Sequence, residues 1–148
     1  MFLTLFNKRL LLMIQQKEIH LPPFRKGFHL ISRYIEKELD RLPPSGLLNL
    51  FIKHTSAALI LVENADPSVR SDLEYYFKKL VPENDPDYSH TLEGSDDMPA
   101  HIKSSLFGAS LTIPITGGRL NLGTWQGVCL CEFRNNGGSR SIVITVFS

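Results

Sequence analysis

The sequence predicts an α+β protein with a largely antiparallel, β-sandwich-like sheet, two longer helices and one short helix. Two observations carry this prediction. Apolar residues alternate at period 2 through several segments, and these strand-like segments come in runs that helical patterns interrupt. The regular strand–helix alternation of a parallel sheet is not seen. The 148 residues suit a single globular domain and are too few for a (β/α)₈ barrel, which needs about 250.

Residues 1–13 are interpreted as a leader that is disordered or not native, followed by one domain over residues 14–148. Lys8 and Arg9 interrupt the apolar residues of this leader, which is untypical of a signal peptide. The apolar stretch is also far shorter than the roughly 20 residues of a membrane span. The absence of a secretion signal and the presence of only two cysteines favour the cytoplasm.

The first strand is expected over residues 14–21, before two consecutive prolines. A helix is expected from Gly27 onward, because apolar residues recur at helical spacing at Phe28, Ile31, Tyr34, Ile35 and Leu39. A turn at residues 43–46 ends this region. Strands then follow over residues 47–54 and 56–62, and period 2 places His54 at the end of the apolar face of the first.

A second helix begins at Asp66-Pro67, which offers an N-cap carboxylate and a proline at the first helical position. Its expected apolar face consists of Val69, Leu73, Tyr76, Phe77 and Leu80. Residues 81–96 form a long polar loop. A third, short helix is expected from Asp97 to Gly108, where glycine suits the end of a helix.

Four further strands are expected over residues 109–116, 119–122, 128–134 and 139–147. Gly117-Gly118 is a two-residue hairpin signal between the first two, and residues 135–138 are expected to join the last two in the same way. The glycine-rich residues 117–127 could instead offer backbone N–H groups to an anion. Trp125 in this segment suits a core anchor or a ligand platform equally well. Cys129 and Cys131 are expected to be buried free thiols.

The charges are balanced overall but unevenly placed. Sixteen Lys and Arg residues against fifteen Asp and Glu residues give a net charge of +1, so no global field favours nucleic acid or a membrane. Between Lys79 and Lys103, however, there are six carboxylates and two of the five histidines, without any Lys or Arg. A solvated acidic loop would explain the charges alone. The length of the loop and the presence of His90 and His101 favour a functional interpretation.

Asp97 and His101 are four residues apart, which places both side chains on one face of a helix. A carboxylate beside an imidazole can orient its tautomer, and the pair can also ligate a metal. His54 suits a satisfied core residue or a third imidazole. A site made of His54, His90 and His101 would suit Zn²⁺. Mg²⁺ would prefer oxygen ligands, which Asp97, Glu63 and Asp66 could supply.

Four segments carry a resemblance to a known family: HTSAA at residues 54–58, ENADP at 63–67, EGSDDMPAHIKSS at 93–105 and GRLNLGTWQ at 118–126. They occur in order, and together they resemble the signatures of the YjbQ-type family, known as secondary thiamine-phosphate synthases. The resemblance runs from about residue 14 to the C-terminus. It implies a YjbQ-like α+β fold and a homotrimer with sites near subunit contacts.

The resemblance also implies a polar site lined by His54, His90, Asp97 and His101, with Thr124 and Gln126 contributed by the GTWQ loop. The implied reaction joins hydroxymethylpyrimidine diphosphate to thiazole phosphate and releases pyrophosphate. Such chemistry needs a divalent cation or basic groups to stabilise the leaving charge. Further expected substrate contacts are Glu63, Lys103 and Arg119. Two alternatives stay open: a metal-dependent hydrolase of unknown substrate and a non-catalytic binder of a small anionic metabolite.

Overall fold

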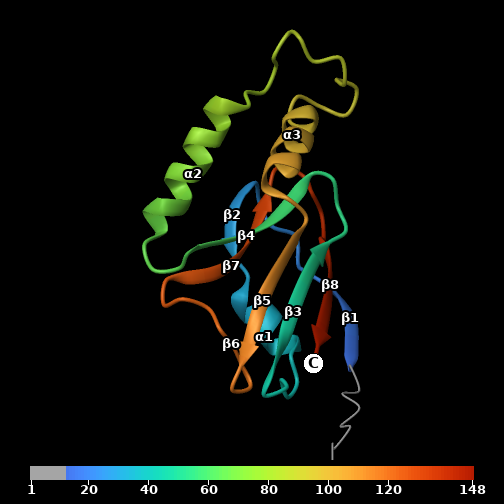
Figure 1. The fold of residues 1–148 in the computed structure, drawn as a ribbon. Helices are drawn as coiled ribbons and strands as arrows, with labels where there is room; N and C mark the ends of the chain where they lie inside the picture. Colours follow the sequence, from blue (N-terminus) through green and yellow to red (C-terminus); the bar gives the residue numbers. More distant parts are fainter. Residues whose placement is uncertain (1–12) are drawn as a thin grey trace, which may run out of the picture.

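The computed structural model describes residues 13–148, which form two antiparallel sheets packed face to face, with three helices around them (Figure 1). The larger sheet has the strand order β1 (Ile14–His20), β8 (Ser141–Phe147), β3 (Ser45–Ile52), β5 (Ser110–Thr116) and β6 (Arg119–Leu120). The smaller sheet has the order β2 (Gly27–Leu30), β7 (Gln126–Glu132) and β4 (Ala57–Glu63). The predicted α+β class with a largely antiparallel sandwich is therefore confirmed.

The main core lies between the two sheets. Leu48, Leu50 and Ile52 alternate along β3 toward this core, and Leu59 and Leu130 face them from the smaller sheet. A second apolar cluster covers the other face of the smaller sheet, where Ala58, Cys129 and Cys131 meet side chains of the helices. Because both faces of β7 are buried, its apolar residues run almost continuously instead of alternating.

The chain passes from one sheet to the other between β3 and β4 and again between β7 and β8. The sequence left the pairing of the first two strands open and predicted a hairpin for the last two. β3 and β4 lie in different sheets, and residues 53–56 carry the chain between them. The predicted hairpin between β7 and β8 is wrong, because these strands also belong to different sheets. The hairpin at Gly117-Gly118 is confirmed: both glycines have positive φ, and Thr116 pairs with Arg119.

The helices agree in number with the prediction but differ in length. Gly27–Leu30 is strand β2 and not the start of a helix, so the first helix, α1, covers only Ser32–Glu38. A four-residue strand that pairs with β7 overrides the helical spacing of Phe28 and Ile31. The short helix is therefore α1, whereas α3 (Asp97–Phe107) has 11 residues. Helix α2 (Pro67–Leu80) begins as predicted, with Asp66 Oδ1 accepting from Ser68 N at 2.8 Å.

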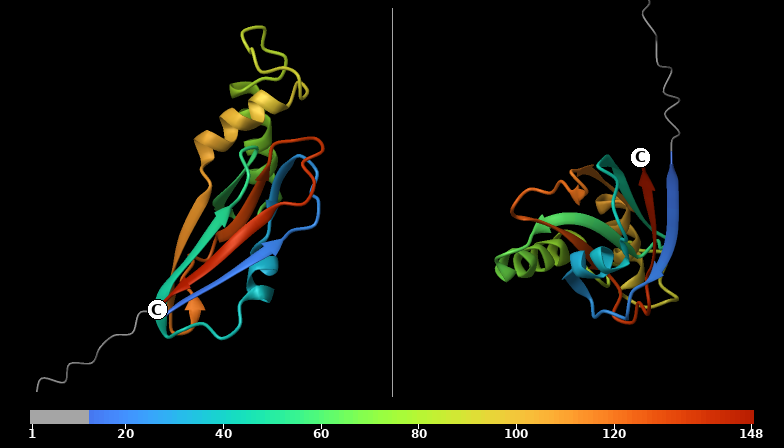
Figure 2. Two further views of the ribbon diagram at one scale, coloured as in Figure 1. Left: turned by 90° about the vertical axis from the view of Figure 1, so that its right-hand side faces the viewer. Right: turned by 90° about the horizontal axis from the view of Figure 1, so that it is seen from below.

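Helix α2 lies outside the smaller sheet, away from β1 (Figure 2). Val69, Leu73 and Phe77 of its predicted apolar face pack against the second cluster. Tyr76 and Leu80 instead are 65% and 67% exposed, so the buried stripe is narrower than expected. The loop of residues 81–96 extends beyond the ends of the sheets and leads back into α3 (Figure 1).

Several smaller expectations are also resolved. Both cysteines are free and buried, and burial raises the pKa of the Cys131 thiol, with Cys129 adding to the shift. Trp125 is 63% exposed and is not a core anchor. The predicted leader lies outside the described residues except for Met13, whose backbone pairs with Ser148. In the part of the chain that the structure describes, no helix is long and apolar enough to cross a bilayer.

Candidate functional site

Four side chains converge where the long loop enters α3. His90 and Glu93 come from the loop, and Asp97 and His101 come from the first turns of the helix. One possible ligand atom from each lies within 4.8 Å of the others. The predicted pairing of Asp97 with His101 on one helix face is therefore present, and His90 joins it. Glu93, four residues before Asp97 in the sequence, is the fourth member. We call these four residues the His–carboxylate cluster.

Asp97 is the centre of this cluster and is only 1% exposed. Its Oδ2 atom accepts from His90 Nε2 at 2.7 Å and lies 3.3 Å from His101 Nε2, while Oδ1 accepts from the Arg134 guanidinium. Burial by itself raises the pKa of Asp97. Hydrogen bonding with Glu93 and His90 and the nearby charge of Arg134 outweigh burial, so the pKa lies below its ordinary value.

Arg134, just after β7, ties the cluster to the smaller sheet. Its Nε donates to Asp96 Oδ2 at 3.1 Å, and its Nη2 donates to the carbonyl of Glu93 at 2.9 Å. Asp96 Oδ2 also accepts from Asn135 N at 2.8 Å. Although burial opposes the charged form of Asp96, the Asn135 amide and the Arg134 guanidinium hold its pKa below the ordinary value. One guanidinium thus positions the loop and the start of the helix together.

His101 is oriented by a backbone group of the segment between β3 and β4. Its Nδ1 lies 3.0 Å from the carbonyl oxygen of Thr55. Because a carbonyl only accepts, Nδ1 carries the proton, and a neutral ring then presents a lone pair at Nε2. That Nε2 faces the Asp97 carboxylate, which also only accepts. A cation shared between Nε2 and the carboxylate, or a second proton on the ring, would satisfy both acceptors.

The donor set fits a metal of the zinc type. Two imidazole nitrogens and two carboxylates are ligands that Zn²⁺ and similar ions accept, and the hydrogen bond from His101 to Thr55 is the outer contact that such histidines usually make. The oxygen-only set proposed for Mg²⁺ is not assembled. Asp66 caps α2, and Glu63 Oε2 accepts from Asp66 N at 2.9 Å, at the end of β4 remote from this cluster.

His54 lies outside the His–carboxylate cluster, although the sequence grouped it with His90 and His101. Its Nε2 accepts from Ser141 N at 2.8 Å, so this nitrogen is already used where β8 begins. Burial lowers the pKa of His54, and the charge of Arg140 lowers it further. The neutral ring is the form that can accept the Ser141 proton. β3 ends at Ile52, so His54 lies in the connection between β3 and β4 and is not held by the pairing of the strand.

The residues of the GTWQ loop form a separate group. Glu63 pairs with Gln126 in the register of β4 and β7, whereas Ala57, next to the Thr55 contact, pairs with Glu132. Ala57 and Glu63 are the two ends of β4, and the six residue steps between them span roughly 20 Å. Gln126 Oε1 accepts from Gly123 N at 2.9 Å, and the Thr124 carbonyl accepts from Asn64. Within one chain, this group does not reach the His–carboxylate cluster.

The two predicted cationic contacts also lie elsewhere. Arg119 is in β6 and lines a cavity with Glu36 and Leu120. Lys103 is on α3 but is two residues from His101, which places it on another side of the helix, where it lines a cavity with Phe77 and Phe133. Burial lowers the pKa of Lys103. The charges of Lys26 and Lys78 act in the same direction.

Sequence reasoning missed two members of the site. Glu93 was counted among the acidic residues of the loop, and its spacing of four residues from Asp97 is a signal that could have identified it. Arg134 had no such signal. It is 37 residues from Asp97 along the chain, and only the packing of α3 against the smaller sheet brings it into the site.

Most of the chain is similar to several known proteins. The family described as UPF0047 protein YjbQ-like matches residues 17–148. The UPF0047 protein YjbQ of Salmonella typhimurium is 53% identical over 133 residues, covering 88% of this chain and 96% of the relative. YugU of Bacillus subtilis is 42% identical over 106 residues, covering 70% and 76%. The crystal structure of a conserved hypothetical protein from Thermus thermophilus has a TM-score of 0.76 at 38% identity, covering 86% and 97%.

Proposed function

Because this chain belongs to the UPF0047 YjbQ-like family, we propose that it is a divalent-metal-dependent enzyme that acts on small phosphorylated substrates in the manner of a thiamine-phosphate synthase. One observation carries the proposal: the convergence of His90, Glu93, Asp97 and His101 within 4.8 Å. A divalent cation held there would act as a Lewis acid toward the negative charge of a diphosphate leaving group. This is the requirement that the transfer reaction imposes on its site.

The protein's own groups would supply binding and orientation. The Thr55 carbonyl fixes the tautomer of His101, and Arg134 holds the Asp97 carboxylate in place. His90 is about half exposed and comes from the loop, so it can meet a ligand that arrives from solvent. A His101 ring that carries a second proton could instead donate it to the leaving group.

Hydrolysis is the second candidate, and the imidazole content of the cluster favours it. A site with two histidines that is open to solvent resembles the ligand sets of hydrolytic zinc enzymes more than those of magnesium-dependent transferases. The same residues would then serve a reaction in which water replaces the thiazole substrate.

One assay separates these candidates. The purified protein is given hydroxymethylpyrimidine diphosphate, with or without thiazole phosphate, after metal removal and after addition of Zn²⁺ or Mg²⁺. A synthase releases pyrophosphate and forms thiamine phosphate only when both substrates and the metal are present. A hydrolase releases phosphate or pyrophosphate without thiazole phosphate. Turnover that is absent under all conditions, together with retained ligand binding, would support the non-catalytic binder instead.

Variants assign the activity to the cluster. His101→Ala removes a proposed ligand, and His20→Ala is its matched control because His20 is an exposed histidine of β1. We expect the first variant to lose turnover and the second to retain it. Equal turnover in His101→Ala and the unaltered protein would contradict the proposal.

We also propose that the protein is a cytoplasmic homotrimer. Tyr75, Tyr76 and Leu80 leave an apolar strip on α2 that is 55–67% exposed, which is typical of a surface that a second copy covers. In an assembly, the GTWQ group of one copy could approach the His–carboxylate cluster of another. Light scattering after size exclusion tests the assembly: a trimer mass is expected for the unaltered protein and a lower mass for Tyr76→Glu. A monomeric unaltered protein would contradict it.

A further inference from the structure

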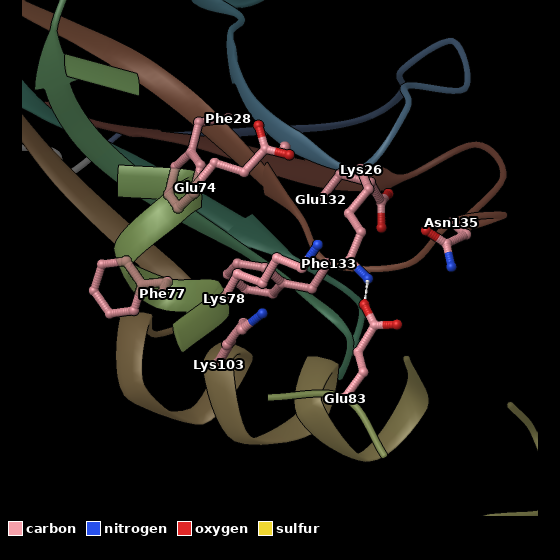
Figure 3. Close-up of a pocket in the computed structure, with 11 residues that line it drawn as sticks. Lys26, Phe28, Glu74, Phe77, Lys78, Glu83, Lys103, Glu132, Phe133 and Asn135 are labelled. Carbon is pink, nitrogen blue, oxygen red and sulfur yellow. Dashed lines mark hydrogen bonds and ion pairs between the residues drawn. The ribbon is translucent and has the colours of Figure 1, made fainter. Parts of the chain in front are cut away.

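A cavity of about 230 Å³ lies between α2, α3 and the smaller sheet (Figure 3). None of its lining residues belongs to the His–carboxylate cluster. We call it the Lys103 cavity. Its apolar wall consists of Phe28, Phe77 and Phe133, and the Nζ atoms of Lys26, Lys78 and Lys103 enter it from three different parts of the chain.

Lys103 is the unusual member of this lining. The residue is only 5% exposed, yet its Nζ atom has no hydrogen-bond or ion-pair partner among residues 13–148, and the aromatic ring of Phe133 is 6.0 Å away. No side-chain nitrogen or oxygen of these residues is both sealed from solvent and unpartnered. The Lys103 amine therefore opens into the cavity. A nearly buried amino group without a partner is costly unless a bound group satisfies it.

The remaining charges of the lining determine what the cavity can take. Lys26 is paired with Glu83, and the Glu132 carboxylate accepts from the Arg140 guanidinium and from Arg134 N. Lys78, Lys103 and Glu74 remain, so the lining offers two positive groups against one negative group. The Glu74 carboxylate lies close to the backbone at Gly27. Gly27 has a φ of +136, and because it has no side chain, there is room for this carboxylate.

We propose that the Lys103 cavity is a second ligand site that binds a small aromatic anion, with the ring between the phenylalanine walls and the anionic group at Lys103. Its volume is below the range of about 300–1,000 Å³ that is usual for drug-sized ligands, which limits the ligand to a single ring with short substituents. The anionic group is a carboxylate or a phosphate. This site does not depend on a metal or on the activity proposed above.

The test is a titration of ¹⁵N-labelled protein followed by NMR, in EDTA so that metal binding does not contribute. The probes are benzoate, phenyl phosphate and the neutral benzyl alcohol. We expect both anions to shift the backbone amides around Phe28, Phe77, Lys103 and Phe133, and at least one to bind about tenfold more tightly than benzyl alcohol, as a charge-assisted contact would give. The stronger of the two anions identifies the anionic group.

Lys103→Met keeps the length and apolar stem of the side chain and removes its charge. We expect it to weaken binding of the stronger anion at least about fivefold. Lys79→Gln is the charge-matched control, because Lys79 lies over the ring of Tyr75 at 4.3 Å outside the cavity lining, and it should bind as the unaltered protein does. Anion shifts elsewhere on the unaltered protein, equal binding of benzyl alcohol, or unchanged binding by folded Lys103→Met would each overturn the proposal. If Lys103→Met does not fold, the unaltered protein alone tests the proposal, through the positions of the shifted amides and the preference for the anions over benzyl alcohol.

Discussion

His101 donates its Nδ1 proton to the backbone carbonyl of Thr55 across 3.0 Å, which joins helix α3 to the segment where the chain passes from one sheet to the other. This hydrogen bond fixes the ring, so that Nε2 can only face Asp97. The geometry of the cluster therefore depends on a sheet crossover that is 46 residues away in the sequence.

Asp97→Asn should weaken Zn²⁺ binding at least about tenfold, because the amide removes the charge that both imidazoles face. The fold should persist, since Arg134 keeps its contacts with Asp96 and Glu93. Isothermal titration with Zn²⁺ measures the first effect and circular dichroism the second. Asp87→Asn, an exposed carboxylate of the same loop, is the control. Unchanged Zn²⁺ affinity in Asp97→Asn would exclude this residue as a ligand.

Arg134→Gln should loosen the loop of residues 81–96, because one guanidinium holds Asp96, Asp97 and the Glu93 carbonyl. The expected loss in the free energy of unfolding is about 1.5–3 kcal/mol, the range for hydrogen bonds to charged groups. Hydrogen exchange measured by mass spectrometry should show faster exchange in this loop. Arg33→Gln removes an exposed arginine of α1 and should change neither quantity. If the loop of Arg134→Gln exchanged as slowly as that of the unaltered protein, Arg134 would not hold the loop in place.

The free energy of unfolding should fall as the pH is lowered just below 6.5, because the pKa of His54 is lowered from that value by burial and by Arg140. In this window the unfolded chain binds a proton that the folded chain resists, so stability rises with pH and the contribution is lost toward acid. The loss stops below the folded pKa, where both states are protonated.

Urea unfolding at about pH 7 and about pH 5.5 measures this dependence. His54→Gln, whose amide oxygen can still accept from Ser141 N, should have the smaller change between the two pH values. His20→Gln serves as the control. If the unaltered protein and His54→Gln changed equally, His54 would not be the titrating group.

Gly137→Ala should be strongly destabilising, because the added Cβ would overlap Glu132 Oε2 and lie 2.6 Å from Arg140 Nη2. Glu132 and Arg140 form a buried ion pair at 2.6 Å, and disrupting such a pair costs about 3–5 kcal/mol. Gly138→Ala is the neighbouring control: it has open space and only a positive φ, so its cost should be about 1–2 kcal/mol. Thermal unfolding compares the two, and an equal loss would show that the ion pair tolerates the methyl group.

Much of the fold could be read from local patterns. The alternation in residues 47–52 and the Gly117-Gly118 turn depend on neighbours in sequence, and both elements formed as expected. The first helix was overestimated, because Phe28 and Ile31 also suit a strand followed by a helix, and only pairing of Gly27–Leu30 with β7 decides between them. The β7–β8 hairpin failed for the same reason, since a turn signal does not say which sheet the next strand joins.

In the candidate site, too, some relations depend on local sequence and others on tertiary packing. The sequence by itself determined that Asp97 and His101 share a helix face, because this relation needs only the helical repeat. Tertiary structure alone decided that Arg134 joins them, that His54 instead holds Ser141, and that Lys103 faces a separate cavity. Side chains far apart in the sequence meet according to sheet membership and layer packing. Sheet membership and layer packing depend on the whole chain, whereas the residues that share a helix face are determined by the helical repeat within a single turn.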